Sequence, residues 1–146
     1  METNQQKLYK VAFDSIGHDA SPYDQVIDEY GCAESVSTLI NKVTTFPIIT
    51  GTTSLVYRLE HDQQFEEIQS PETGCIIISA TGTGNGNLSN GHTGIVGKNL
   101  SPDGSLWVMS NSSDSGLWSV NYTIKRWIAR YETFGGMKTR YFRLLG

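Results

Sequence analysis

The chain lacks long apolar runs and has little positive charge. No stretch of its 146 residues is apolar over the roughly 20 positions needed to span a bilayer, and residues 1–7 lack the apolar core of a secretory signal. We therefore expect synthesis in the host cytoplasm without a signal peptide, and no integral membrane association. The formal net charge of −4 argues against nucleic acid as the main partner, because phosphate binding requires clustered Lys and Arg.

Cysteine is also scarce, with Cys32 and Cys75 as the two examples. No Cys or His cluster has the spacing of zinc ligands, so we expect no metal and no other cofactor. A chain of this length closes one core without covalent staples, and a Cys32–Cys75 bridge is not expected. Cys75 begins an apolar, β-rich segment, in which a buried and inert thiol is the expected state.

The apolar patterns predict helices first and strands afterwards. Residues 3–16 and 31–43 carry apolar side chains at helical spacing, and a shorter helix is expected at 54–59. The β-rich segments that follow are residues 75–80, 93–98, 105–110 and 142–145. This order predicts an α+β domain whose N-terminal helices pack on a mainly antiparallel sheet. No repeat or second domain is visible, so residues 1–146 are expected to form a single domain.

Cys32 and His92 are the candidates for nucleophilic chemistry. Cys32 follows Gly31 at the predicted start of a helix, where unpaired backbone N–H groups stabilise a thiolate. His92 follows the glycine-rich loop 81–91, which lacks the Gly-Lys-Ser/Thr of a phosphate loop, and opens a predicted strand. An imidazole at a strand end is a suitable general base for a thiol. A buried thiol with no role is the alternative for Cys32.

A third polar group should orient the imidazole. The turn at residues 101–104 pairs the strand that follows it with the His92 strand, and this returns the end of one strand to the start of the other. Asn111 is therefore our candidate for a Cys-His-Asn arrangement. Ser110 and Asp114 are the alternatives, because the sequence does not fix the register between the two strands to within one residue.

Two aromatic residues are candidates for substrate contacts. Tyr30 precedes the Gly-Cys pair and is placed to line a cleft or to lend its hydroxyl to an oxyanion. Trp118 lies in a Ser- and Gly-rich segment and is placed to stack on a sugar ring or a peptide substituent. Core packing is the alternative for both. The basic residues near the end of the chain form either a solvated surface or a face for an anionic polymer; they are Lys125, Arg126, Arg130, Lys138, Arg140 and Arg143.

Four segments together carry a family resemblance. They are residues 31–36 (Gly-Cys-Ala-Glu-Ser-Val), 71–78 (Pro-Glu-Thr-Gly-Cys-Ile-Ile-Ile), 91–96 (Gly-His-Thr-Gly-Ile-Val) and 108–111 (Val-Met-Ser-Asn). In this order they resemble the CHAP and NlpC/P60 superfamily of papain-like cysteine peptidases, and more narrowly small phage endolysin-type peptidoglycan hydrolases. The resemblance covers roughly residues 20–145. One departure is Gly74-Cys75, where members commonly have Gly-Asp.

The resemblance implies a function and roles for three residues. Cys32 would attack an amide bond of the bacterial cell-wall peptide, His92 would act as its base, and Asn111 would orient the imidazole. The protein would be a monomeric, bacteriolytic hydrolase of peptidoglycan with a single catalytic domain and no separate wall-binding domain. It would reach the cell wall through a holin-type pore during phage lysis. The other interpretations are an antibacterial amidase effector injected into a neighbouring cell, and a non-catalytic wall-binding or virion structural domain with the same fold.

Overall fold

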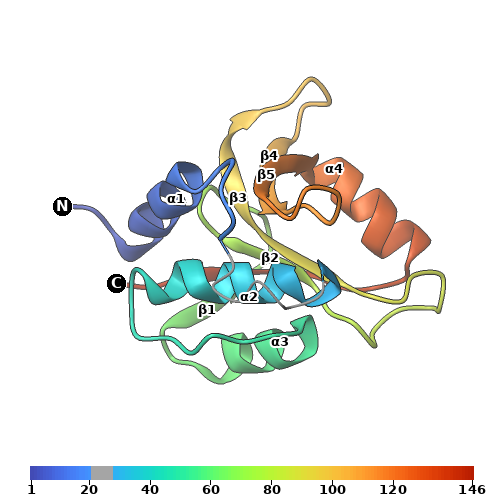
Figure 1. Ribbon diagram of the computed structural model, residues 1–146, viewed down its shortest axis with the longest axis horizontal. Coiled ribbons are helices and arrows are strands. Elements are labelled where there is room, and N and C mark those ends of the chain that lie inside the picture. Colours follow the sequence, from blue (N-terminus) through green and yellow to red (C-terminus); the bar gives the residue numbers. More distant parts are fainter. Residues whose placement is uncertain (21–27) are drawn as a thin grey trace.

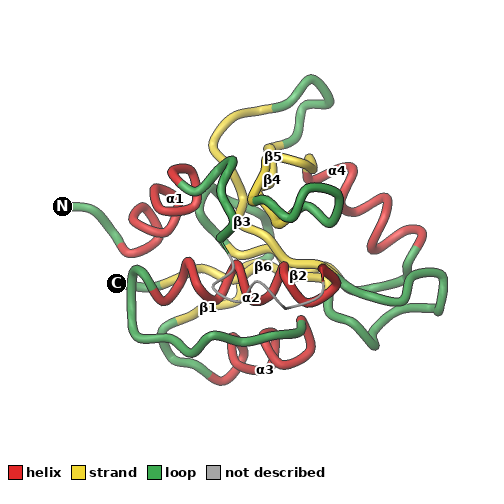
Figure 2. The backbone as a smooth tube through the Cα atoms, in the orientation of Figure 1, coloured by secondary structure: helices red, strands yellow, loops and turns green. Residues whose placement is uncertain are grey.

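Helices lie on both sides of one antiparallel sheet (Figures 1 and 2). The computed structural model describes residues 1–20 and 28–146, with the side chains of residues 28–30 left out. The helices that precede the sheet are α1 (Asn4–Asp14), α2 (Asp28–Asn41) and α3 (Thr52–His61). The strands are β1 (Phe65–Ile68), β2 (Ile76–Ser79), β3 (His92–Leu100), β4 (Leu106–Asn111), β5 (Trp118–Thr123) and β6 (Thr139–Leu144). Between β5 and β6 the chain forms α4 (Ile124–Trp127) and a π-helix, η1 (Ile128–Phe134).

The strand order in the sheet is β1-β6-β2-β3-β4-β5, and every neighbouring pair is antiparallel. The last strand of the sequence therefore lies between β1 and β2. The hairpin of β3 and β4 forms the upper projection in Figure 1. The two ends of the chain meet, because the backbone N–H of Asn4 donates to the carbonyl of Gly146 over 2.8 Å.

Side chains alternate along β2 between two apolar cores. Ile76 and Ile78 pack with the helices α1 to α3 on one face of the sheet, while Cys75 and Ile77 pack with α4 and η1 on the other. A strand that is covered on both faces requires a continuous apolar run, and this explains the three consecutive isoleucines. Each fully buried isoleucine contributes about 1.5–3 kcal/mol through apolar burial.

The predicted α+β architecture is confirmed, with N-terminal helices packed on an antiparallel sheet. The strands β1 and β5 were missed, and so were the helices α4 and η1. β1 reads Phe-Glu-Glu-Ile and β5 reads Trp-Ser-Val-Asn-Tyr-Thr, so polar residues obscure the alternation in both. The helix that carries Cys32 also begins earlier than predicted, at Asp28.

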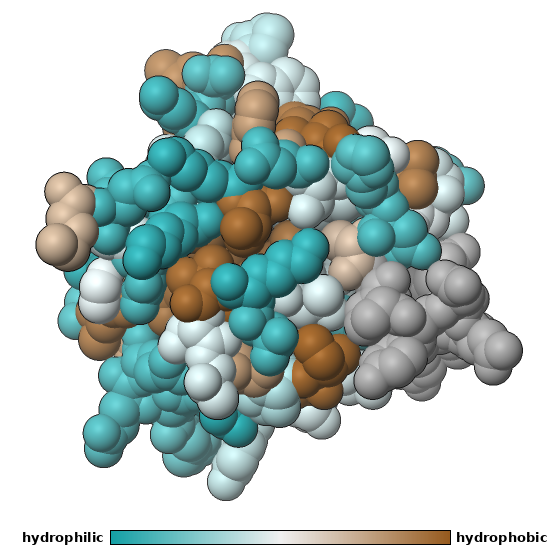
Figure 3. All heavy atoms as spheres, turned by 60° about the vertical axis from the view of Figure 1, so that its left-hand side comes forward, coloured by the Kyte–Doolittle hydropathy of each residue, from teal (hydrophilic) through white to brown (hydrophobic). Residues whose placement is uncertain are grey.

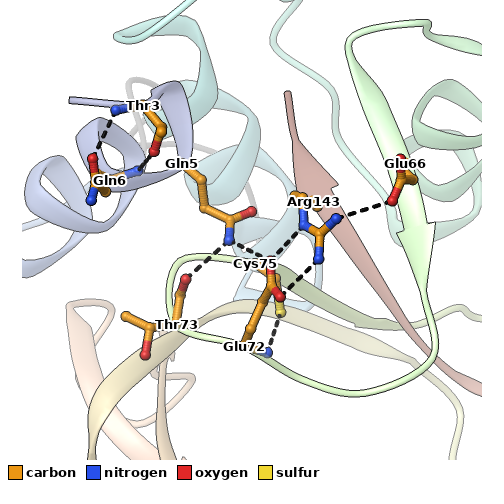
Figure 4. Close-up of polar contacts among 8 residues, drawn as sticks. All are labelled: Thr3, Gln5, Gln6, Glu66, Glu72, Thr73, Cys75 and Arg143. Carbon is orange, nitrogen blue, oxygen red and sulfur yellow. Dashed lines mark hydrogen bonds and ion pairs between the residues drawn. The ribbon is translucent and has the colours of Figure 1, made fainter. Parts of the chain in front are cut away.

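A network of hydrogen bonds and ion pairs joins α1 to the loop before β2 and to the strands β6 and β1 (Figure 4). Arg143 in β6 makes two parallel hydrogen bonds to the Glu72 carboxylate, of 2.6 and 2.9 Å. The same carboxylate accepts from Gln5 Nε2 over 2.8 Å, and Arg143 also pairs with Glu66 over 3.1 Å. This paired arrangement fixes the loop before β2, because bidentate Arg–carboxylate contacts are geometrically specific.

The α1 side of the molecule carries scattered apolar side chains. Figure 3 shows apolar patches there that are separated by hydrophilic groups. A small hollow of about 70 Å³ lies on the α1 and β3–β5 surface, with Phe13, Trp107 and Val120 among its walls.

None of the helices in the described residues is long and apolar enough to cross a membrane.

Candidate active site

Cys32 and His92 line one cavity of about 460 Å³. The cavity lies where β3 begins, and its other walls come from the loop before β3, the turn after β4, and β5, α4 and η1. The two groups are 60 positions apart in the sequence (92 minus 32), so the fold alone brings them to this shared space. The volume falls in the range of small-molecule sites, about 300–1,000 Å³.

Cys32 is buried in α2, with 3% of its surface exposed. Burial raises the pKa of its thiol to about 11, although hydrogen bonds from the backbone N–H of Thr93 and Ala33 and from its own N–H oppose this effect. The contact with Thr93 places the sulfur against the residue that follows His92. The thiol is therefore protonated at neutral pH in the resting protein.

The structure corrects the expectation that the N-terminus of the helix stabilises the Cys32 thiolate. Because α2 begins at Asp28, Cys32 is its fifth residue. The first four N–H groups of an α-helix lack intrahelical partners, and the fifth bonds to the carbonyl four residues earlier. The Cys32 N–H thus lies past the unpaired turn, and burial dominates the pKa of the thiol.

His92 lies among three aromatic rings on the α4–η1 side of the sheet. Its ring centroid lies 5.0 Å from that of Trp127, 5.6 Å from that of Tyr131 and 5.8 Å from that of Tyr122. Burial lowers the pKa of the imidazole to about 4, and the positive charge of Arg130 contributes in the same direction. The imidazole is therefore neutral at pH 7.

A hydrogen-bond chain sets the tautomer of His92. Its Nε2 lies 2.9 Å from Ser110 Oγ, and Ser110 Oγ donates to Asn121 Oδ1 over 2.5 Å. Because a serine hydroxyl has a single proton, Ser110 must accept from Nε2–H. Nδ1 then keeps its lone pair. The hydrogen bond from Nε2 orients the imidazole, and the lone pair on Nδ1 is free to accept a proton. A general base needs this arrangement.

Asn111 does not occupy the position predicted for it. The register pairs Gly94 with Ser110, and this places the Ser110 side chain beside His92 and turns Asn111 to the opposite face of the sheet. Its Nδ2 lies against Gly31, where an added Cβ would be 2.8 Å away. Its Oδ1 is buried without a hydrogen-bond partner among the described residues. Ser110, one of the alternatives, makes the contact expected of Asn111, while Asn111 lies beside the nucleophile's helix.

No hydrogen bond between described side chains joins the Cys32 sulfur to the His92 ring. His92 shares the face of the sheet occupied by Trp127, because its cross-strand partner Ser79 accepts from Trp127 Nε1 over 3.0 Å. The helix that carries Cys32 packs on the other face. The two groups thus approach the cavity from opposite sides of the start of β3, as a neutral thiol and a neutral imidazole.

The remaining predicted residues have different outcomes. Trp118 is fully buried in the core with α1 to α3, so its predicted stacking on substrate is wrong. The burial of this large apolar ring determines its position, although its neighbours in the sequence are polar. Tyr30 lies in α2, but its side chain is outside the described residues. Asp114 lines the cavity, whereas His18 and His61 are exposed elsewhere on the surface.

Several residues of the cavity were not predicted as part of the site. Asn121 and Tyr122 lie on the missed strand β5, and Tyr131 lies on the missed η1. Arg126 and Arg130 were noted only as part of a basic surface; their spacing of four residues was the signal that they share a side of one helix. Within the described residues, no three His, Cys, Asp or Glu side chains gather as a metal site would require.

Comparisons with solved structures find a match for this chain, and comparisons by sequence find none. No protein-family model and no curated protein matches the chain. The chain superposes on a chain of the crystal structure of the type VI native effector–immunity complex Tae3–Tai3 from Ralstonia pickettii. The TM-score is 0.57 at 16% identity, over 98% of this chain and 99% of that one. The match shows a common fold, and the resemblance to CHAP and NlpC/P60 rests on the motifs alone.

Proposed function

We propose that the protein is a cysteine-dependent amide hydrolase that cleaves an amide bond in bacterial peptidoglycan. The observation that carries this proposal is the shared cavity of Cys32 and His92, in which Ser110 and Asn121 hold the imidazole with Nδ1 unprotonated. A thiol, an oriented base and a cavity of ligand size are the elements of nucleophilic amide hydrolysis. The motif resemblance supplies the substrate class.

The reaction begins from a neutral pair. Proton transfer from a thiol of pKa about 11 to an imidazole of pKa about 4 is strongly uphill in the resting site. Substrate binding must therefore turn the two groups toward each other and stabilise their charges. His92 Nδ1 then takes the thiol proton as the sulfur attacks the carbonyl carbon. His92 returns the proton to the leaving amine, and water hydrolyses the thioester.

Asn111 is proposed to bind the oxyanion. Its Nδ2 lies beside Gly31, the residue before the nucleophile, and a side-chain amide is a suitable donor to a developing negative charge. Loss of one such donor typically costs about 10²–10³ in turnover. This role replaces the orienting role first expected for Asn111.

Two biological settings fit the same chemistry. The structural match to a chain of an effector–immunity complex favours an antibacterial effector that is delivered into a neighbouring cell. The motif resemblance favours a phage endolysin that waits in the host cytoplasm for a holin-type pore. In both settings we propose that residues 1–146 form one catalytic domain and that its binding partner is the peptidoglycan of the cell wall.

Hydrolysis of purified cell walls tests the proposal. We expect the wild-type protein to clear the walls and to release new amine and carboxyl ends, identified by mass spectrometry of the released muropeptides. Cys32→Ala and His92→Ala should each lose this activity, while Cys75→Ala, the matched control in the opposite core, should keep it. Clearing by Cys32→Ala would remove the thiol mechanism. Wall binding by the wild type without release would instead support the non-catalytic domain.

A further inference from the structure

Two arginine side chains line the cavity on its α4–η1 side. Arg126 lies in α4 and Arg130 in η1, four residues further along the same continuous helical segment. Neither was part of the chemistry assigned to the site. Their guanidinium groups share the cavity with the thiol of Cys32 and the imidazole of His92.

Neither arginine has a carboxylate partner within the part of the chain that the structure describes. The two arginines of β6 differ in this respect. Arg140 bridges two glutamates, and Arg143 bridges two others. The two arginines of β6 are thus paired with carboxylates, whereas the two that line the cavity have no carboxylate on their guanidinium groups among the described residues.

Arg130 is held in place by Tyr131. Its guanidinium carbon lies 5.5 Å from the centroid of the Tyr131 ring, and its pKa is raised mainly by a hydrogen bond with the Tyr131 hydroxyl. Tyr131 is buried and stacks on His92. The guanidinium is therefore preorganised beside the base, and little side-chain entropy is lost when an anion binds.

The cavity has an excess of positive charge. Asp114 is the one acidic residue among its described walls, against the two arginines. The thiol and the imidazole are both neutral at rest. An anionic group on a ligand would therefore meet a favourable field and two planar donors that match a carboxylate.

We propose that Arg126 and Arg130 form a carboxylate-binding subsite, and that the substrate is an acidic peptide with a free carboxylate near the amide bond that is cut. The inference rests on the proposed function for the identity of the reaction. Stem peptides of peptidoglycan carry free carboxylates close to their amide bonds, so they fit this requirement. A carboxylate anchored on the η1 side leaves the rest of the ligand directed toward Cys32 on the α2 side.

The subsite also acts on the base. The charge of Arg130 disfavours the imidazolium form of His92, and a bound carboxylate would offset that charge. The other charged side chains that line the cavity are Arg126 and Asp114, and Arg130 is the charged group that acts on the pKa of His92. Binding of an acidic substrate therefore makes His92 a stronger base at the moment when the base is needed.

Peptide binding to the Cys32→Ala protein, which cannot turn over, tests the subsite. The probes are the tetrapeptide L-alanyl-γ-D-glutamyl-meso-diaminopimelyl-D-alanine and the same peptide with carboxamides in place of its carboxylates. We expect the acidic form to bind at least roughly 10-fold more tightly, since hydrogen bonds between charged groups are stronger than those between neutral groups. The NMR-measured pKa of His92 should rise with the acidic peptide and stay unchanged with the carboxamide.

Arg126→Gln and Arg130→Gln, each in this background, should weaken binding of the acidic peptide roughly 10-fold and leave the carboxamide unaffected. Lys125→Gln is the matched control, because this neighbour in α4 loses the same charge but bonds the carbonyl of Asp103 instead of lining the cavity. Equal binding of the two peptides, no binding of either, or full affinity in both arginine variants would overturn the subsite. The wall-clearing assay reports on the proposed function separately: clearing without carboxylate preference removes the subsite alone, and carboxylate-dependent binding without clearing removes the hydrolase alone.

Discussion

Cys32 and Cys75 are both buried and both free, yet their surroundings differ in the features that matter for reactivity. Burial is the main cause that raises the pKa of each thiol, to about 11 for Cys32 and about 12 for Cys75. Each sulfur also receives a backbone N–H, from Thr93 and from Glu72 respectively. Neither burial nor hydrogen bonds from the backbone therefore distinguish the Cys32 thiol from the Cys75 thiol.

Access separates them. Cys32 opens onto a cavity that also holds an oriented imidazole, whereas Cys75 is enclosed by the second core and by the Glu72–Arg143 pair (Figure 4). The comparison shows that a nucleophile in this fold is defined by what shares its space. It also shows that a depressed resting pKa is not the signature to look for here, because both thiols are neutral.

The largest expected difference between the two thiols is in alkylation. We expect iodoacetamide to modify Cys32 roughly 100-fold faster than Cys75 in the folded protein, because reagent reaches Cys32 through the cavity. Peptide mapping by mass spectrometry measures both rates in one sample. In guanidinium chloride the rates should converge, and equal rates in the native protein would remove the distinction drawn from access.

A methyl group at Gly31 sharpens the comparison on the Cys32 side. In Gly31→Ala the new Cβ would lie 2.8 Å from Asn111 Nδ2, so Asn111 must move. Overpacking costs about 1–3 kcal/mol, which exceeds the gain of up to about 1 kcal/mol from replacing a helical glycine. Wall hydrolysis should fall about 10- to 100-fold, because small displacements at an active site are that costly.

The double variant Gly31→Ala/Asn111→Ala separates packing from chemistry. It should recover the thermal stability of the wild type, since the crowded amide is removed. It should not recover hydrolysis if Asn111 donates to the oxyanion. Recovery of both would assign Asn111 a packing role only.

Acid should destabilise the protein through His92. The folded-state pKa of about 4 lies below the ordinary histidine value of 6.5, so between these values the unfolded chain binds the additional proton. Stability therefore rises with pH across this window and is lost as pH falls from about 6.5 to about 4, by on the order of 3 kcal/mol. Urea unfolding at several pH values measures this, and His92→Gln should flatten the dependence across that window.

The smallest expected effect is on the Cys75 side. The pKa of Glu72 is lowered to about 2, first by the hydrogen bond from Arg143. This carboxylate therefore stabilises the fold at pH values above 4.5, the ordinary pKa of glutamate, and loses that effect as the pH falls toward 2. Because its side chain is 38% exposed, solvent screening limits the contribution, and we expect Glu72→Gln to cost under about 1 kcal/mol in thermal unfolding at pH 7. Wall hydrolysis should not change.

Part of the site was readable from the sequence because local patterns specify it. The alternation and helical spacing placed Cys32 on a helix and His92 at the start of a strand, and the turn at 101–104 correctly paired β3 with β4. The prediction of the residue that orients the imidazole was wrong by one position, since Ser110 makes this contact and Asn111 was expected to. A strand register that shifts by one position exchanges the two faces of the sheet, and a single sequence carries no signal for that parity.

The sequence by itself determined the elements and the candidate chemistry, since spacing and residue type are local properties of the chain. Only the tertiary structure decided which side chains meet. It buried Trp118 in the core, placed Ser110, which is bonded in turn to Asn121, against His92, and brought Arg126 and Arg130 to the cavity. These outcomes depend on packing between segments far apart in the chain. The tertiary structure also makes the Cys32 thiol and the His92 imidazole neutral. The pKa of a buried group is determined by desolvation, which no local sequence pattern encodes.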